Sequence, residues 1–171
     1  MKLLSFPVLF VLLTSFVHPQ AKEGEVSGQS LYQRAVSACV AKQLSDYGTQ
    51  NEETRSRLTK RLFLKDQILT EKLPAEFKEI KVQYVGVDEL LALYKEKKKR
   101  ARKTDRIEIP FTIVRPMKNE GSTLIVSLSD YWFSYKKKTY QYALEGGCNA
   151  HFNFETKSGQ LALTKTDLWG V

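Results

Sequence analysis

The chain has 171 residues, with 27 Lys and Arg against 19 Asp and Glu, two cysteines and two histidines. This length is typical of a single domain, and an apolar share of 42% argues against wholesale disorder. Sites that need several histidines are excluded outside the first 21 residues, because only His151 lies beyond them.

The first 21 residues are typical of a secretory signal peptide. Lys2 supplies the positive end, an apolar run extends from Leu3 to Val17, and Ala21 is a candidate cleavage point. A helix of about 15 residues is roughly 23 Å long, shorter than the ~30 Å hydrocarbon core of a membrane. We therefore expect a cleaved signal, a secreted or periplasmic protein, and no membrane span in the mature chain.

We expect a flexible polar lead over residues 22–29 and a single α+β domain over residues 30–171. Apolar residues spaced by three and four from Tyr32 to Tyr47 predict a first helix. A second helix is expected to start near Thr49 or Asn51, in a region closed by Pro74. The apolar side of this second helix is formed by Leu58, Leu62 and Phe63.

Alternating apolar residues predict five strands in the rest of the domain, with a third helix after the first of them. Asp88 is the expected N-cap of that helix, Pro110 indicates an edge strand or a bulge, and Gly146-Gly147 indicates a bulge that bends a long strand. Residues 118–121 predict a turn. The expected strands are Lys78–Val85, Arg106–Arg115, Thr123–Tyr135, Thr139–Glu155 and Gln160–Val171.

Helices followed by a meander predict an α+β fold, with N-terminal helices packed on one curved antiparallel sheet. Two helices, a strand, a third helix and a bent meander ending in Leu168-Trp169-Gly170-Val171 resemble the nuclear transport factor 2-like, or cystatin-like, cone fold. The chain also resembles small uncharacterised exported bacterial proteins. The resemblance covers about residues 30–171 and is topological. It implies a concave sheet that could hold a ligand and domains that could pair as homodimers, but it does not imply one activity.

The two cysteines, Cys39 and Cys148, fall on a predicted helix and a predicted strand. In an oxidising compartment they could form a disulfide that joins the two layers across a loop of about 110 residues. They could equally remain unpaired and buried as small apolar side chains.

Few side chains are candidates for catalysis. Cys148 and His151 are three residues apart on a strand and point to opposite faces, which argues against a nucleophile pair. His151 is expected to be exposed or paired across strands. No spacing in the chain predicts a metal site or a cofactor.

Asp130 lies on the face of Leu128 and Trp132, in a strand that we expect to be largely buried. A carboxylate there must be paired, hydrogen-bonded or raised in pKa. One interpretation is a proton shuttle, with Tyr131 and other tyrosines (Tyr140, Tyr142) as hydroxyl donors. The other is an aspartate at a strand end that meets water or a lysine, and Asp167 has the same two interpretations.

The run Lys95–Lys103 contains seven positive residues among nine. It predicts either a solvated helix end or a platform for a polyanion such as anionic lipid headgroups. Nucleic acid is not expected, because no aromatic residue interrupts the run to stack on bases. The candidate binding residues are Lys97, Lys98, Lys99, Arg100, Arg102 and Lys103.

These features favour an exported, non-catalytic domain that binds a ligand or a protein partner. Two alternatives stay open. One is an isomerase-like or hydratase-like enzyme that uses a buried aspartate with tyrosine, and the other is a basic protein that associates with anionic surfaces.

Overall fold

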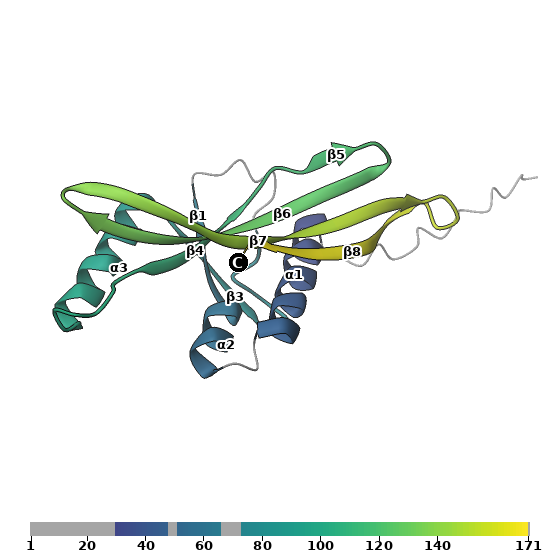
Figure 1. The fold of residues 1–171 in the computed structure, drawn as a ribbon. Helices are drawn as coiled ribbons and strands as arrows, with labels where there is room; N and C mark the ends of the chain where they lie inside the picture. The colour runs from purple at the N-terminus through teal and green to yellow at the C-terminus, as the bar shows by residue number, and fades with distance from the viewer. Residues whose placement is uncertain (1–29, 48–50, 66–72, 171) are drawn as a thin grey trace, which may run out of the picture.

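A computed structural model describes residues 30–47, 51–65 and 73–170; the predicted signal peptide and polar lead lie outside these residues. The fold is α+β, with a curled mixed sheet that forms a half-barrel and helices packed on it (Figure 1). The helices are α1 (Leu31–Tyr47), α2 (Glu52–Thr59) and α3 (Val87–Arg100). The strands are β1 (Lys60–Leu64), β2 (Glu76–Phe77), β3 (Ile80–Val85), β4 (Ile109–Val114), β5 (Lys118–Glu120), β6 (Thr123–Lys136), β7 (Thr139–Glu155) and β8 (Gln160–Gly170).

The sheet runs in the order β2-β3-β1-β4-β6-β7-β8, and β5 pairs with β6. The expectation of an antiparallel sheet is wrong at β1, which is parallel to both β3 and β4. The predicted second helix extends too far. The observed helix α2 ends at Thr59, and β1 follows at once. Both faces of β1 are at least partly covered, because Phe63 is buried in one apolar cluster and Leu62 packs against the other. Two adjacent apolar residues of this kind resemble part of a helix face.

The expected edge position of Pro110 and the expected turn at 118–121 are also corrected. β4 lies inside the sheet, between β1 and β6, but β1 pairs with it only through Phe63 and Thr112. Pro110 is therefore not paired with β1, and its lack of a backbone N–H costs no hydrogen bond to that strand. Residues 118–120 form β5, and the chain reverses at Gly121, whose φ of 64° suits glycine.

Two apolar clusters hold helices on the sheet. In the first, α1 packs on β6, β7 and β8, and buried residues such as Val36, Val40 and Phe152 form the cluster together with residues of β1 and β3. A disulfide between Cys39 and Cys148 joins α1 to β7 in this cluster, with a Cα–Cα distance of 5.7 Å. In the second cluster, α3 packs on β4 and β6. No helix among the described residues is long and apolar enough to cross a membrane.

The bend in β7 lies beside the predicted Gly146-Gly147 pair. Asp130 of β6 is opposite Gly146 while Tyr131 is opposite Leu144, so Glu145 is the extra residue of the bulge. A Cβ atom at Gly146 would collide with the backbone carbonyl of Trp169 in β8. The two glycines therefore allow three strands to approach closely at the bend, as bulges commonly do.

Helix α3 begins two residues earlier than expected. Its N-cap is Gly86 and not Asp88, because the carboxylate of Glu89 accepts a hydrogen bond from the Gly86 N–H. Both Glu89 oxygens also lie 2.8 Å from the Lys65 ammonium. These two contacts, the lysine first, hold the pKa of Glu89 below its ordinary value of 4.5.

This shift predicts how acid affects the fold. A carboxyl group whose pKa is lowered by folding stabilises the protein at pH values above the pKa that the group has in the unfolded chain. This contribution disappears as the pH falls through the pKa that the group has in the folded protein. We expect Glu89→Gln to lower the melting temperature at pH 7, and to lower it much less at pH 3. Thermal melts between pH 3 and 7 test this, with Glu79→Gln as the exposed control. An equal effect of Glu89→Gln at both ends of the range would contradict it.

Candidate functional site

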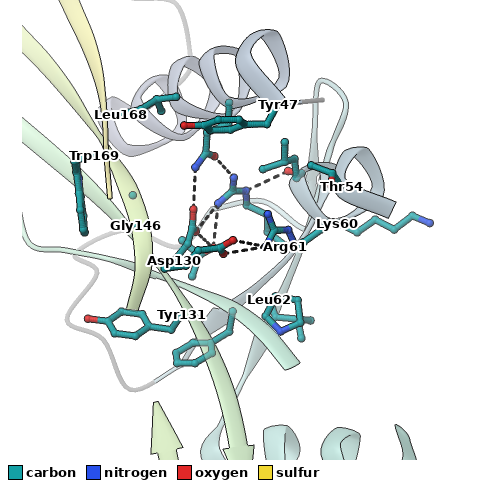
Figure 2. Close-up of a pocket in the computed structure, with 18 residues that line it drawn as sticks. Tyr47, Thr54, Lys60, Arg61, Leu62, Asp130, Tyr131, Gly146, Leu168 and Trp169 are labelled. Carbon is teal, nitrogen blue, oxygen red and sulfur yellow. Dashed lines mark hydrogen bonds and ion pairs between the residues drawn. The ribbon is translucent and has the colours of Figure 1, made fainter. Parts of the chain in front are cut away.

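A cavity of about 240 Å³ lies where β7 bends, between the sheet and the helices α1 and α2 (Figure 2). It draws its walls from seven elements that are far apart in the chain. Its polar and charged lining residues are Gln43, Tyr47, Thr54, Arg57, Lys60, Arg61, Thr112, Asp130, Tyr131 and Glu145. Its remaining lining residues are Leu58, Leu62, Pro110, Phe111, Gly146, Gly147, Leu168 and Trp169.

The floor of this pocket is a network of hydrogen bonds around Asp130. One carboxylate oxygen accepts from Nη1 of Arg61 at 2.9 Å and from the Thr112 hydroxyl at 2.7 Å. The other accepts from Nε2 of Gln43 at 2.8 Å. Nη2 of Arg61 donates back to the Gln43 side-chain carbonyl, which closes a ring of partners. The four side chains come from α1, β1, β4 and β6, so the network forms only when all four elements are in place.

Local structure explains why a charged residue is tolerated at Arg61, which is 4% exposed. It is the second residue of β1 and points inward, and its Nε donates to the Leu58 carbonyl in the last turn of α2. A cation is favoured at a helix C-terminus, where carbonyl groups lack partners. A buried ion pair is otherwise costly, and additional hydrogen bonds such as these offset its desolvation.

A second ion pair lies at the mouth of the pocket. Nη1 of Arg57 is 2.9 Å from both carboxylate oxygens of Glu145, the bulged residue of β7. The guanidinium also lies over the ring of Trp132, with its carbon 5.0 Å from the centroid. Nη1 is the only Arg57 nitrogen with a hydrogen-bond partner in the described part of the chain, so Nε and Nη2 are available to other acceptors.

Apolar groups complete the opening. Leu168 and Trp169 of β8 lie across the pocket from Leu62 of β1 (Figure 2). Lys60 contributes its stem to the rim, but its ammonium extends away from Asp130 (Figure 2). The pocket thus combines an apolar wall with one partly exposed guanidinium, over a floor whose charges are already paired.

The predicted proton-shuttle residues are not arranged as a shuttle. Asp130 lies within β6 and not at its end, and its charged partner is Arg61 and not a lysine. The Tyr131 hydroxyl accepts a hydrogen bond from Arg115 at 2.7 Å, and its ring stacks on Phe111. Tyr140 and Tyr142 are exposed on the β6–β7 hairpin and do not line the pocket. Burial, and then the neighbouring Tyr140, raise the pKa of Tyr142, so its hydroxyl stays protonated at neutral pH.

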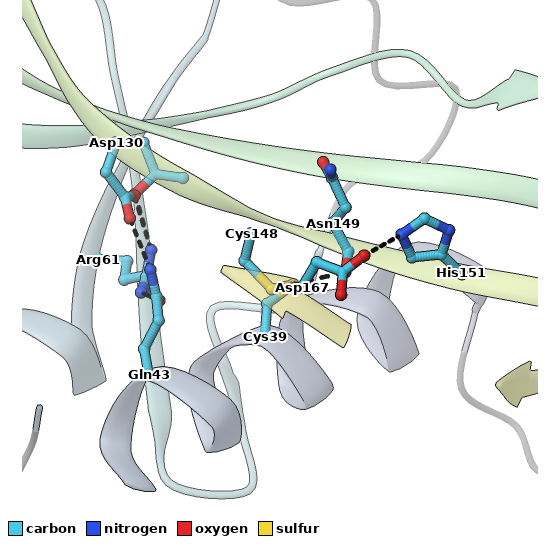
Figure 3. The surroundings of a disulfide bond; sticks show 9 residues. Cys39, Gln43, Arg61, Asp130, Cys148, Asn149, His151 and Asp167 are labelled. Atoms are coloured by element: carbon cyan, nitrogen blue, oxygen red, sulfur yellow. Dashed lines mark hydrogen bonds and ion pairs between the residues drawn. A yellow bond between two sulfur atoms is a disulfide. The ribbon is translucent and has the colours of Figure 1, made fainter. Parts of the chain in front are cut away.

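His151 and Asp167 lie on the far side of the disulfide from this pocket (Figure 3). They pair across β7 and β8, with Nε2 of His151 3.0 Å from a carboxylate oxygen of Asp167. A hydrogen bond from Lys165, and then smaller effects of His151, lower the pKa of Asp167. The pair is a cross-strand contact, and neither residue lines the pocket.

The basic residues at the end of α3 are exposed and lie apart from the pocket. Three further lysines, Lys136–Lys138, form the turn of the β6–β7 hairpin at the same end of the molecule (Figure 1). Tyr94 of α3 holds the two segments together, because its ring contacts Tyr135 edge-on at 6.4 Å. We call this surface, formed by residues 95–103 and 136–138, the basic end.

Of the residues that form the pocket, the sequence singled out only Asp130 and Tyr131 as candidate site residues. Arg61 carried little signal, because Lys60 beside it is charged as well and the apolar run Leu62–Leu64 begins only after it. Gln43, Arg57 and Glu145 carried none, since their relation to Asp130 depends on the fold. Within residues 30–170, as far as they are described, no cluster of three or more His, Cys, Asp or Glu could hold a metal ion.

Comparisons with protein-family models, curated proteins and solved structures find no match for this chain. The resemblance to the nuclear transport factor 2-like superfamily therefore stays a prediction. Function has to be argued from the pocket and the surface themselves.

Proposed function

We propose that the chain is an exported, non-catalytic domain that binds a small ligand in the pocket at the β7 bend. The observation that carries this proposal is a hollow whose lining includes both apolar side chains and the Arg57 guanidinium, two of whose nitrogens have no partner among the described residues. Ligand pockets typically combine apolar lining with a few fixed polar groups. A volume of about 240 Å³ is below the usual ~300–1,000 Å³ of such sites, which favours a small molecule.

The lining favours a ligand with an acceptor head and an apolar body. Arg57 would bind a carboxylate or carbonyl through Nε and Nη2, the geometry that guanidinium groups favour. Leu168 and Trp169 would cover the apolar part. Glu145 and the stacked Trp132 restrain the Arg57 side chain before a ligand arrives, which reduces the entropy lost on binding.

Two further observations support binding over catalysis, and export over retention. The carboxylate of Asp130 already accepts three side-chain hydrogen bonds and is paired with Arg61, which disfavours its use as a proton acceptor in the cavity. The disulfide is characteristic of oxidising compartments, which agrees with the predicted signal peptide.

A fluorescence titration tests ligand binding, because Trp169 lines the pocket. Benzoate and hexanoate serve as probes, because each joins a carboxylate, which accepts hydrogen bonds, to an apolar group. We expect a saturable change in tryptophan emission, and Arg57→Gln should weaken binding by about tenfold, or ~1.4 kcal/mol. Arg55→Gln is the matched control, since it is exposed on the same helix and does not line the pocket. Absence of saturation, or equal weakening in both variants, would refute the proposal.

A second candidate function is association of the basic end with anionic lipid headgroups. The observation that favours it is the joining of two basic segments that lie more than 30 residues apart in sequence. Clustered lysines and arginines contribute about 1 kcal/mol each near such a surface. The contribution is screened by salt, and it does not require an enclosed site.

Vesicle sedimentation separates this candidate from the pocket function. We expect the protein to bind phosphatidylglycerol vesicles at low salt and to be released at 1 M salt. Lys98→Glu and Lys136→Glu, one in each segment, should both weaken binding, while Lys157→Glu at another turn should not. Binding that resists salt, or that Lys157→Glu reduces as much as the other two, would count against the basic end.

A further inference from the structure

The first seven residues of β7 have a free edge. β6 pairs with β7 from Thr139 to Glu155, but β8 pairs with it only from Gly146 onward. Over Thr139–Glu145, no described strand covers the other side of β7. Such an edge presents unpaired backbone N–H and C=O groups, which form a template for another strand.

This edge lacks the features that usually protect one. Thr139–Glu145 contains no proline and no lysine, and its one bulged residue is at the end of the segment. Tyr140, Tyr142 and Leu144 point to one face and are 41%, 46% and 55% exposed. The two tyrosine rings lie against Phe133, with centroids 5.9 and 5.8 Å away, so they form a fixed apolar ladder along the edge.

We propose that this edge pairs antiparallel with the same segment of a second copy of the chain, which makes one continuous sheet across a two-fold dimer. The two-fold axis lies between the Tyr142 residues of the two copies. In this register Tyr142 meets Tyr142 of the second copy, and Tyr140 meets Leu144. All three exposed apolar side chains of each copy are then covered, whereas a shift of one residue would place them on opposite faces.

The length and charge of the segment single out a second copy as the occupant. The free edge is bounded by the Lys137-Lys138 turn at one end and by the start of β8 pairing at the other, so it accepts about seven residues. A second copy supplies a strand of that length. Antiparallel pairing places each lysine turn next to Glu145 of the other copy. It also separates the two basic ends by roughly 24 Å, the length of seven strand residues, whereas parallel pairing would place them side by side.

Sedimentation equilibrium of the purified protein between about 1 and 200 μM tests the proposal. We expect a reversible dimer, and Tyr142→Lys should raise its dissociation constant at least tenfold, because it places two ammonium groups opposite each other. Phe154→Lys is the matched control, since Phe154 is 59% exposed on the same strand where β8 already covers the edge. Near-UV circular dichroism verifies that both variants keep the native fold.

Cross-linking gives a readout that does not depend on the charge variant. Tyr142→Cys should form a covalent dimer under mild oxidation, because opposite strand residues have Cα atoms about 4.5–5.5 Å apart, within disulfide range. Phe154→Cys should not. A wild-type monomer at 200 μM, or equal cross-linking of the two cysteine variants, would overturn the proposal. A dimer that Phe154→Lys dissociates as readily as Tyr142→Lys would place the interface elsewhere and overturn it too.

Discussion

Removing the Cys39–Cys148 disulfide is expected to destabilise the protein by about 4–5 kcal/mol. The bond joins residues 109 apart, and closing a loop of about 100 residues in the unfolded chain contributes roughly 4.7 kcal/mol in the chain-entropy model. Total stabilities of single domains are typically about 5–15 kcal/mol, so the reduced protein should be close to unfolding. Urea unfolding of the oxidised protein and of Cys39→Ala/Cys148→Ala measures the difference.

The double alanine variant also provides the control for reduction. Dithiothreitol should lower the urea midpoint of the wild type and leave that of the variant unchanged. Because Cys148 directly follows Gly147 of the pocket lining, loss of the bond should also weaken binding of benzoate to the protein that remains folded. A loss of stability below about 1 kcal/mol would show that the unfolded chain is already restrained by other contacts.

Asp130→Ala is expected to destabilise the fold by about 3–5 kcal/mol, because it leaves the Arg61 guanidinium buried without a charged partner. The side chain of Arg61 is 3% exposed and that of Asp130 is 18% exposed, so little water can replace the lost carboxylate. Gln43 and Thr112 lose an acceptor in the same variant. The measurement is the free energy of unfolding in urea at pH 7.

Two comparisons identify the cause of this loss. Asp46→Ala breaks the exposed pair with Lys42 on α1 and should cost less than about 1 kcal/mol. Asp130→Leu combined with Arg61→Met removes both charges, so the double variant should be more stable than the sum of the single effects predicts. Strict additivity of Asp130→Leu and Arg61→Met would mean that the two residues act independently.

The strands of the β6–β7 hairpin were predictable because two signals in their sequence, the apolar alternation and the charged turn between the strands, indicate the same structure. Alternation over Thr123–Tyr135 and Thr139–Glu155, with lysines between them, gives bounds within a residue of those observed. β1 was not predictable in the same way. It is only five residues long, its two faces are both covered, and an inward-facing arginine interrupts its apolar pattern.

The candidate site was less predictable than the fold. Burial of Asp130 implied that it needs a partner, but which partner it has depends on the parallel placement of β1, which the residue pattern did not predict. The pocket mouth depends on a bulge that turns Glu145 toward α2. The basic end was visible as residues 95–103, whereas the addition of residues 136–138 required the contact between Tyr94 and Tyr135.

The most direct test of ligand binding at the β7 bend is a two-dimensional ¹H–¹⁵N NMR titration of the purified protein with benzoate. The proposal predicts that the largest shift changes lie at Gly146, Gly147, the Trp169 indole N–H and the Arg57 side chain. These should saturate together with one dissociation constant. Changes concentrated on the basic end, residues 95–103 and 136–138, or no saturable change at the bend, would contradict it.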